Sequence, residues 1–105
     1  MTPSLTTGLA DHLMEVLRAH EPELRRAGVR HLSLFGSVAR DEADATSDVD
    51  LAVEFDPAAE MDLFRLNALE RRMTEMLGRR VDLLPEPVEK PRLRASIDRD
   101  RRRAF

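Results

Sequence analysis

The chain has 105 residues, no cysteine, 42% apolar residues, and a net charge of −3 from 17 basic and 20 acidic side chains. This length predicts a single domain over residues 1–105 with one modest core. The lack of cysteine excludes disulfides and thiolate metal sites, and no apolar run approaches the roughly 20 residues of a membrane helix. Because the N-terminus does not resemble a signal peptide, we expect a cytoplasmic protein. Because there is no basic excess, we expect no direct nucleic-acid binding.

The first predicted element is an amphipathic helix, whose apolar stripe consists of Leu9, Leu13, Val16 and Leu17. A break at Pro22 precedes a continuation that stops at Gly28. The segment "VRHLSLF", residues 29–35, is then predicted to be a short buried strand. A brief helical turn follows it and begins at Gly36 and Ser37.

The second half of the chain alternates strands and helices in the same way. A polar stretch leads into the strand "DVDLAVEF", and a helix then begins after the N-cap residue Asp62 and ends at Gly78. The apolar face of that helix comprises Leu66, Leu69, Met73 and Leu77. A third short strand, "VDLL", precedes a terminal helix that we expect over "PRLRASIDRDRRR", with the arginine-rich tail as its solvated end. The pattern predicts an α/β (α+β) fold with flanking helices around a small mixed three-stranded sheet.

Two carboxylates open the second strand on one face. In a strand, residues two apart point the same way, so Asp48 and Asp50 lie together while Val49 and Leu51 face the core. Carboxylates roughly 6.5 Å apart along the backbone repel each other unless a cation is present. Oxygen ligands favour Mg²⁺ or Mn²⁺, and Mg²⁺ commonly combines carboxylates with substrate phosphates. If the third strand pairs beside the second, Asp82 lies about 4.8 Å across the sheet and completes the metal-binding, catalytic group.

The Gly36-Ser37 pair stands where a phosphate would be held. The first backbone N–H groups of a helical turn lack partners within the helix and attract anions. Gly36 has no Cβ to obstruct a phosphate, and Ser37 adds a hydroxyl donor. Arg40 is a further phosphate-contact candidate. The ten-residue spacer 38–47 lets the chain reverse, so the glycine turn and the aspartates meet at one end of the sheet.

Each feature also has a plainer interpretation. A Gly-Ser pair after a strand can be only a turn, an Asp-x-Asp motif can be only a cap and a strand entry, and Asp82 can be only the polar side of an edge strand. An arginine such as Arg40, one turn into a surface helix, can be solvated. The combination of these features in this order, between strands, favours a nucleotide-binding metal site.

The stretch "GSVARDEADATSDVD" resembles the Gly-Ser, ten residues, Asp-x-Asp motif of the polymerase-β-like nucleotidyltransferases, and specifically of the minimal nucleotidyltransferases that act as antitoxins beside HEPN toxins. The likeness extends over nearly the whole chain, through "LGRRVDLL" to "LRASIDRD". One departure is Asp41, which stands where the family commonly has glycine. The resemblance implies that Asp48, Asp50 and Asp82 bind metal and that Gly36 and Ser37 contact the triphosphate.

The same resemblance implies the activity, which is transfer of AMP from ATP, with Mg²⁺, to a hydroxyl of a HEPN-domain toxin, most often a tyrosine. The chain is too short to include an acceptor-binding helical domain, so we expect the acceptor to arrive as a partner protein in a hetero-oligomer. Two alternatives remain at this point. The chain can neutralise a toxin by contact alone, or it can modify a small molecule with the help of a second subunit.

Overall fold

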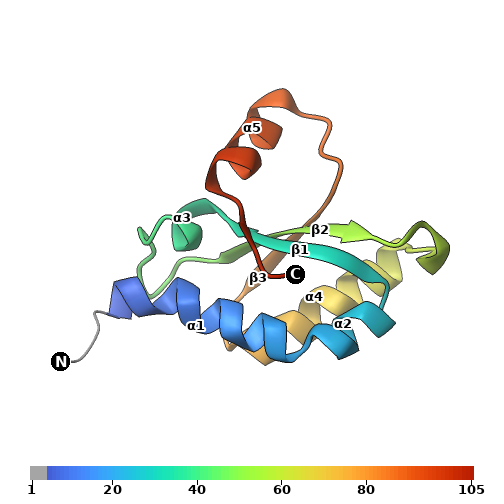
Figure 1. Cartoon of the computed structure of the whole chain (residues 1–105), viewed down its shortest axis with the longest axis horizontal. Coiled ribbons are helices and arrows are strands. Elements are labelled where there is room, and N and C mark those ends of the chain that lie inside the picture. Colours follow the sequence, from blue (N-terminus) through green and yellow to red (C-terminus); the bar gives the residue numbers. More distant parts are fainter. Residues whose placement is uncertain (1–4) are drawn as a thin grey trace.

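The computed structural model describes residues 5–105 and shows a mixed sheet with helices on both faces (Figure 1). The helices are α1 (Leu5–Ala19), α2 (Glu21–Arg26), α3 (Gly36–Ala39), α4 (Leu63–Leu77) and α5 (Pro91–Asp100), with a 3₁₀ turn at Pro57–Ala59. The strands are β1 (Val29–Phe35), β2 (Val49–Phe55), β3 (Val81–Pro85) and β4 (Arg102–Arg103). The strand order is β3-β2-β1-β4, in which β2 and β3 are parallel and the other pairs are antiparallel. The predicted fold class is confirmed, with one more strand than expected.

The main core lies between the sheet and the helices α1, α2 and α4 (Figure 1). Its largest fully buried side chains include Leu13, Leu17, Leu24 and Met73. The predicted cap of α4 is confirmed, because the Asp62 carboxylate accepts a hydrogen bond from the backbone N–H of Arg65 at 2.8 Å. Gly78 ends α4 in the left-handed conformation, with φ at +68°. None of the helices in the described part of the chain has the length and apolar character of a membrane span.

A second, smaller core covers the opposite face of the sheet. Helix α5 packs Ile97 there against Phe35 and Ala52, with Leu84 and Leu93 at its margin. Ala52 shares its face of β2 with Asp50, so this face is acidic at one end and fully buried only two residues later. The predicted alternation is confirmed along β2, and α5 covers the face of the strand just beyond Asp50.

The predicted terminal helix is wrong over its last three residues. Helix α5 ends at Asp100, and the chain then runs antiparallel to β1, where the backbone N–H of Ala104 donates to the carbonyl of Leu32 at 2.8 Å. Arg101 turns the chain away from the helix, and its guanidinium pairs with both oxygens of Glu86 at 2.9 and 2.6 Å. The arginine-rich tail is therefore an edge strand rather than a solvated helix end.

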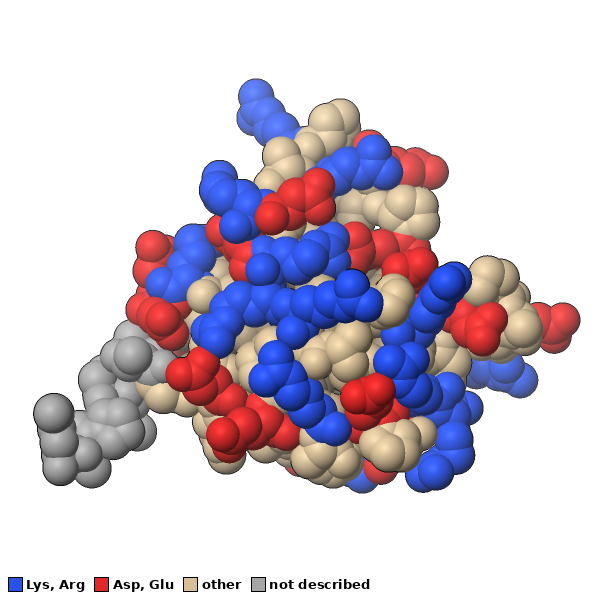
Figure 2. Space-filling model, viewed as in Figure 1, with Lys and Arg blue, Asp and Glu red and all other residues tan. Residues whose placement is uncertain are grey.

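Basic side chains, nearly all of them arginine, gather on the face of the molecule that Figure 2 shows, between patches of acidic residues. Several of them are held in ion pairs, such as Arg102 with Asp11 at 2.5 Å and Arg25 with Glu21 at 2.6 Å. Arg18 reaches from α1 and donates to the carbonyl of Ala104 at 3.0 Å, which covers the outer edge of β4. The arginines therefore fasten the C-terminal tail to the helices and the sheet.

Candidate active site

Strands β2 and β3 bring the predicted carboxylates together. The two strands are parallel, and Asp50 is paired in register with Asp82. Asp48, the first residue of the expected strand, immediately precedes β2. Asp48 and Asp50 are half-buried, whereas Asp82 is exposed. The expectation that Asp82 lies beside Asp50 is confirmed, and its role as a metal ligand stays a prediction.

The glycine turn lies directly against Asp50. Phe35, the last residue of β1, pairs with Asp50 across the antiparallel ladder, and Gly36 then turns the chain with φ at +77°. A Cβ atom built on Gly36 would collide with the Asp50 carboxylate, with the Asp50 Cγ and Cβ atoms at 3.2 and 3.3 Å. The sequence predicts that this glycine leaves space for a phosphate, and the structure shows that it leaves space for the carboxylate.

The spacer between the turn and the aspartates is itself ordered by hydrogen bonds. The Asp44 carboxylate accepts from the backbone N–H of Thr46 at 2.8 Å and from its hydroxyl at 2.7 Å. Arg79, which follows α4, donates to the carbonyl of Ser47 at 3.0 Å. These contacts set where the chain enters β2 and hence where Asp48 lies. Sequence reasoning missed Arg79, because nothing in its local pattern distinguishes it from a solvated arginine.

Asp41 explains the one departure from the family motif. Its φ is +59°, in the left-handed region where glycine is favoured over other residues. Aspartate tolerates this conformation better than most side chains. Aspartate in place of glycine therefore strains the turn after α3.

Arg40 is held in an ion-pair network between α3 and α5. Its Nη1 donates to Asp100 Oδ2 at 2.6 Å and its Nε donates to Glu42 Oε2 at 3.0 Å. Burial alone would raise the pKa of Asp100, but hydrogen bonds from Arg99 and Arg40 hold that pKa below its ordinary value. The phosphate contact expected of Arg40 stays a prediction, and it requires the guanidinium to share or leave these partners.

The electrostatics of the site favour a bound cation. Burial raises the pKa of Asp50 above its ordinary value, and the negative charges of Asp82 and Asp48 raise it further. A divalent cation between these groups would relieve that repulsion. Within residues 5–105, no three His, Cys, Asp or Glu side chains converge closely enough to hold a metal by themselves. The oxygen donors present fit Mg²⁺, which takes its remaining ligands from water and substrate phosphates.

A cavity of about 450 Å³ opens beside these carboxylates. It is lined by Phe35, Asp50, Glu70, Asp82, Leu83, Leu84 and Leu93. Glu70 projects from α4 and accepts a hydrogen bond from the backbone N–H of Leu83 at 3.0 Å, which satisfies the outer edge of β3 next to Asp82. Sequence reasoning missed Glu70, because its role appears only when α4 packs beside β3.

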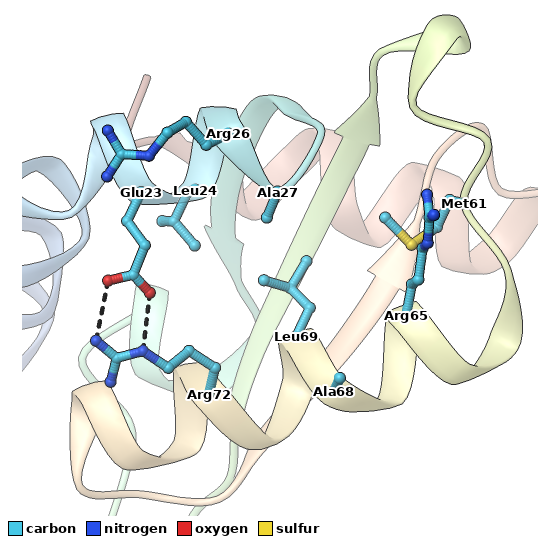
Figure 3. A pocket seen from close by; sticks show the side chains of 9 residues that line it. All are labelled: Glu23, Leu24, Arg26, Ala27, Met61, Arg65, Ala68, Leu69 and Arg72. Atoms are coloured by element: carbon cyan, nitrogen blue, oxygen red, sulfur yellow. Dashed lines mark hydrogen bonds and ion pairs between the residues drawn. The ribbon is translucent and has the colours of Figure 1, made fainter.

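The other large cavity is a groove of about 520 Å³ between α2 and α4 (Figure 3). Its floor includes Leu24 and Leu69, and Arg72 reaches across it to both oxygens of Glu23 at 2.8 and 2.9 Å. This groove shares no lining residue with the carboxylate cavity. The candidate catalytic residues Asp50 and Asp82 therefore line the smaller of these two cavities.

Comparison with known proteins agrees with this geometry. Residues 17–104 match the nucleotidyltransferase domain. The chain belongs to this family. The nucleotidyltransferase is similar to the protein adenylyltransferase MntA of Thermococcus cleftensis, with 41% identity over 75 residues. The alignment covers 70% of this chain and 74% of its relative. The enzyme class predicted from the sequence is thereby confirmed.

Solved structures give the same result for the fold. The nucleotidyltransferase superimposes with a TM-score of 0.66 on a structure described provisionally as a minimal nucleotidyltransferase, at 35% identity over 85% of this chain and 93% of the other. A toxin–antitoxin complex with AMP-PNP also gives a TM-score of 0.66, covering 91% of this chain and 72% of the other. Its identity is 21%, so this second likeness supports the fold alone.

Proposed function

We propose that this nucleotidyltransferase transfers AMP from ATP to a tyrosine hydroxyl of a HEPN-domain toxin. By this modification it acts as the antitoxin of that toxin. The observation that carries the proposal is the register of Asp50 with Asp82 directly beside the Gly36 turn. The adenylyltransferase name of the Thermococcus cleftensis relative supports the choice of nucleotide and reaction. The choice of a toxin as partner follows the toxin–antitoxin complex, with which this chain shares its fold.

The residues of the site have different roles in this proposed reaction. Asp48, Asp50 and Asp82 would hold Mg²⁺, which when bound neutralises triphosphate charge as it does in other nucleotidyl transfers. The Gly36 turn and the Ser37 hydroxyl are placed to donate hydrogen bonds to phosphate oxygens. Asp82 is exposed and therefore able to receive the proton of the attacking hydroxyl. The acceptor approaches from this open side as part of a separate protein.

The test is intact mass spectrometry of the toxin after incubation with the nucleotidyltransferase, ATP and Mg²⁺. We expect the toxin to gain the mass of AMP, and we expect peptide mapping to locate the addition on a tyrosine. The matched variant is Asp48→Asn, which should still form the complex without adding mass. If Asp48→Asn neutralises the toxin as well as the wild type and no mass is added by either, neutralisation is by contact alone. If free small hydroxyl compounds are modified and the toxin is not, the acceptor is a small molecule.

A further inference from the structure

The groove between α2 and α4 combines an apolar floor with basic side chains around it (Figure 3). Leu24 and Leu69 form the buried floor. Ala27 and Ala68 line the walls, and their small side chains leave space between the two helices. The charged residues that line the groove are three arginines and one glutamate: Arg26, Arg65, Arg72 and Glu23. The groove is therefore locally basic in a chain whose net charge is −3.

A segment of the opposite character lies next to this groove. It comprises residues 56–64, "DPAAEMDLF", and we call it the acidic segment. Its last two residues, Leu63 and Phe64, are 69% and 86% exposed, and they are the exposed large apolar side chains of the described part of the chain. The backbone N–H of Asp56 donates to the carbonyl of Gly28 at 2.8 Å, which holds the segment beside the end of α2 (Figure 1). Three of its side chains are acidic and exposed: Asp56, Glu60 and Asp62.

Phe64 does not occupy the groove of its own molecule. It is not one of the residues that line the groove, and its ring is almost fully exposed. Because residues four apart share one side of a helix, Phe64 lies on the same side of α4 as Ala68, next to the groove. Exposed aromatic side chains of this kind are typical anchors of protein interfaces. Phe64 is therefore available to enter the groove of another molecule.

The charges of the groove and the acidic segment are also complementary. Arg72 is engaged with Glu23, and Arg65 donates to a backbone carbonyl of its own chain at 2.9 Å. Arg26 and Glu60 are exposed, and neither takes part in an ion pair within residues 5–105. The groove therefore offers a basic group, and the acidic segment offers an acidic group, to a partner molecule.

We propose that the groove between α2 and α4 receives the acidic segment of a second copy of this chain, with Phe64 as the anchor. Segment and groove lie side by side, so a two-fold rotation places each Phe64 in the groove of the other copy. The assembly closes as a dimer because both complementary surfaces are then used. Glu60 of each copy lies beside Arg26 of the other. The groove shares no lining residue with the carboxylate cavity, so this inference is independent of the proposed function.

The oligomeric state in solution is the first test. The chain has a mass of 12.0 kDa. In analytical ultracentrifugation up to about 1 mM protein, the weight-average mass should rise toward twice that of the chain. Phe64→Ala removes two buried rings from each dimer, so the Kd of the dimer should rise by about 100-fold or more. At low concentration, where both proteins are monomeric, the Tm of this variant should equal that of the wild type because the side chain is exposed.

A charge exchange tests how the two copies are oriented. Arg26→Glu and Glu60→Arg should each weaken the dimer by about tenfold, because each brings like charges together. The double variant restores opposite charges, so it should recover most of the wild-type affinity. Arg71→Glu is the matched control, because it makes the same charge change at an exposed position of α4 that does not line the groove. Its dimer Kd should equal that of the wild type.

NMR of mixed samples identifies what occupies the groove. Unlabelled protein is mixed with protein that carries ¹³C at its leucine and alanine methyl groups, and isotope-filtered NOEs are recorded. We expect NOEs from the Phe64 ring of one copy to the methyl groups of Leu69 and Ala68 of the other.

Three results would overturn the inference. They are a wild type that stays monomeric at the highest concentration, a dimer that is insensitive to Phe64→Ala, and a double charge variant that is no better than the single ones. If the wild type is monomeric and Phe64→Ala instead abolishes binding to the toxin, the groove holds the toxin and the inference is wrong. AMP transfer to the toxin by the wild type decides the proposed function separately.

Discussion

Gly36→Ala isolates the close approach of the glycine turn to Asp50. The substitution has two separable costs. The first is the backbone conformation, because φ is +77° and a side chain there costs about 1 to 2 kcal/mol. The second is the collision of the new methyl group with the Asp50 carboxylate, whose Cγ and Cβ atoms lie at 3.2 and 3.3 Å from the added carbon.

The second cost falls on function, because the side chain of Asp50 must move to make room. A displacement on the order of 1 Å in a catalytic group can lower a rate by about 100-fold. A stability loss of 1 kcal/mol corresponds to a fall in Tm of about 4 to 8 °C for a domain of this size. We therefore expect Gly36→Ala to melt several degrees lower and to transfer AMP about 100-fold more slowly than the wild type.

Gly78→Ala is the matched control. Gly78 has a similar φ of +68° at the end of α4, and a Cβ atom there meets nothing within 4 Å. Both variants should show a similar fall in Tm in a thermal melt, but only Gly36→Ala should lose AMP transfer to the toxin. Full transfer activity in Gly36→Ala, or an equal loss in Gly78→Ala, would show that contact with Asp50 does not matter.

Three further variants test neighbouring groups. Burial, and then the charges of Asp82 and Asp48, raise the pKa of Asp50, so ionisation of Asp50 destabilises the fold as the pH rises through that pKa. Asp50→Asn should therefore have a higher Tm than the wild type at neutral pH and an equal Tm in acid. The same variant should lose transfer activity. Asp41→Gly should remove the backbone strain that a side chain causes at this positive φ. The free energy of unfolding, measured by urea titration, should rise by up to about 1 kcal/mol, and AMP transfer should be unchanged. If the Ser37 hydroxyl donates to a phosphate, Ser37→Ala should lower kcat/KM, with a loss of transition-state stabilisation on the order of 1 to 3 kcal/mol. Wild-type kinetics in this variant would show that Ser37 does not contact the substrate.

The centre of the site is predictable from sequence because it depends on local rules. Alternation along a strand places Asp48 and Asp50 on one face, and parallel pairing of the next strand brings Asp82 into register with Asp50. The Gly-Ser turn is likewise recognisable from its position after a buried strand. The purpose of Gly36 is not predictable in this way, because the carboxylate that occupies its space comes from a residue 14 positions later in the chain.

The parts that sequence misses are those created by tertiary packing. "DRDRRR" has the composition of a solvated helix end, yet Arg101 finds Glu86 and the tail pairs with β1. Glu70 and Arg79 resemble surface residues in sequence, and each instead satisfies backbone groups of a distant segment. Helical periodicity contains no information about such partners, because they depend on where two elements meet.

The tail and the site are connected through α5. Asp100, which ends α5, is buried and pairs with Arg40 beside the glycine turn, while Arg101, the next residue, pairs with Glu86 just after β3. The two adjacent ion pairs therefore fasten the C-terminal end of α5 to the end of α3 and to the segment just after β3. Because α5 also supplies Leu93 to the cavity that Asp82 lines, the contacts that anchor the helix also hold Leu93 in the wall of that cavity. Arg101, which in the sequence resembles part of a solvated tail, thus helps to hold α5 beside the active-site cavity.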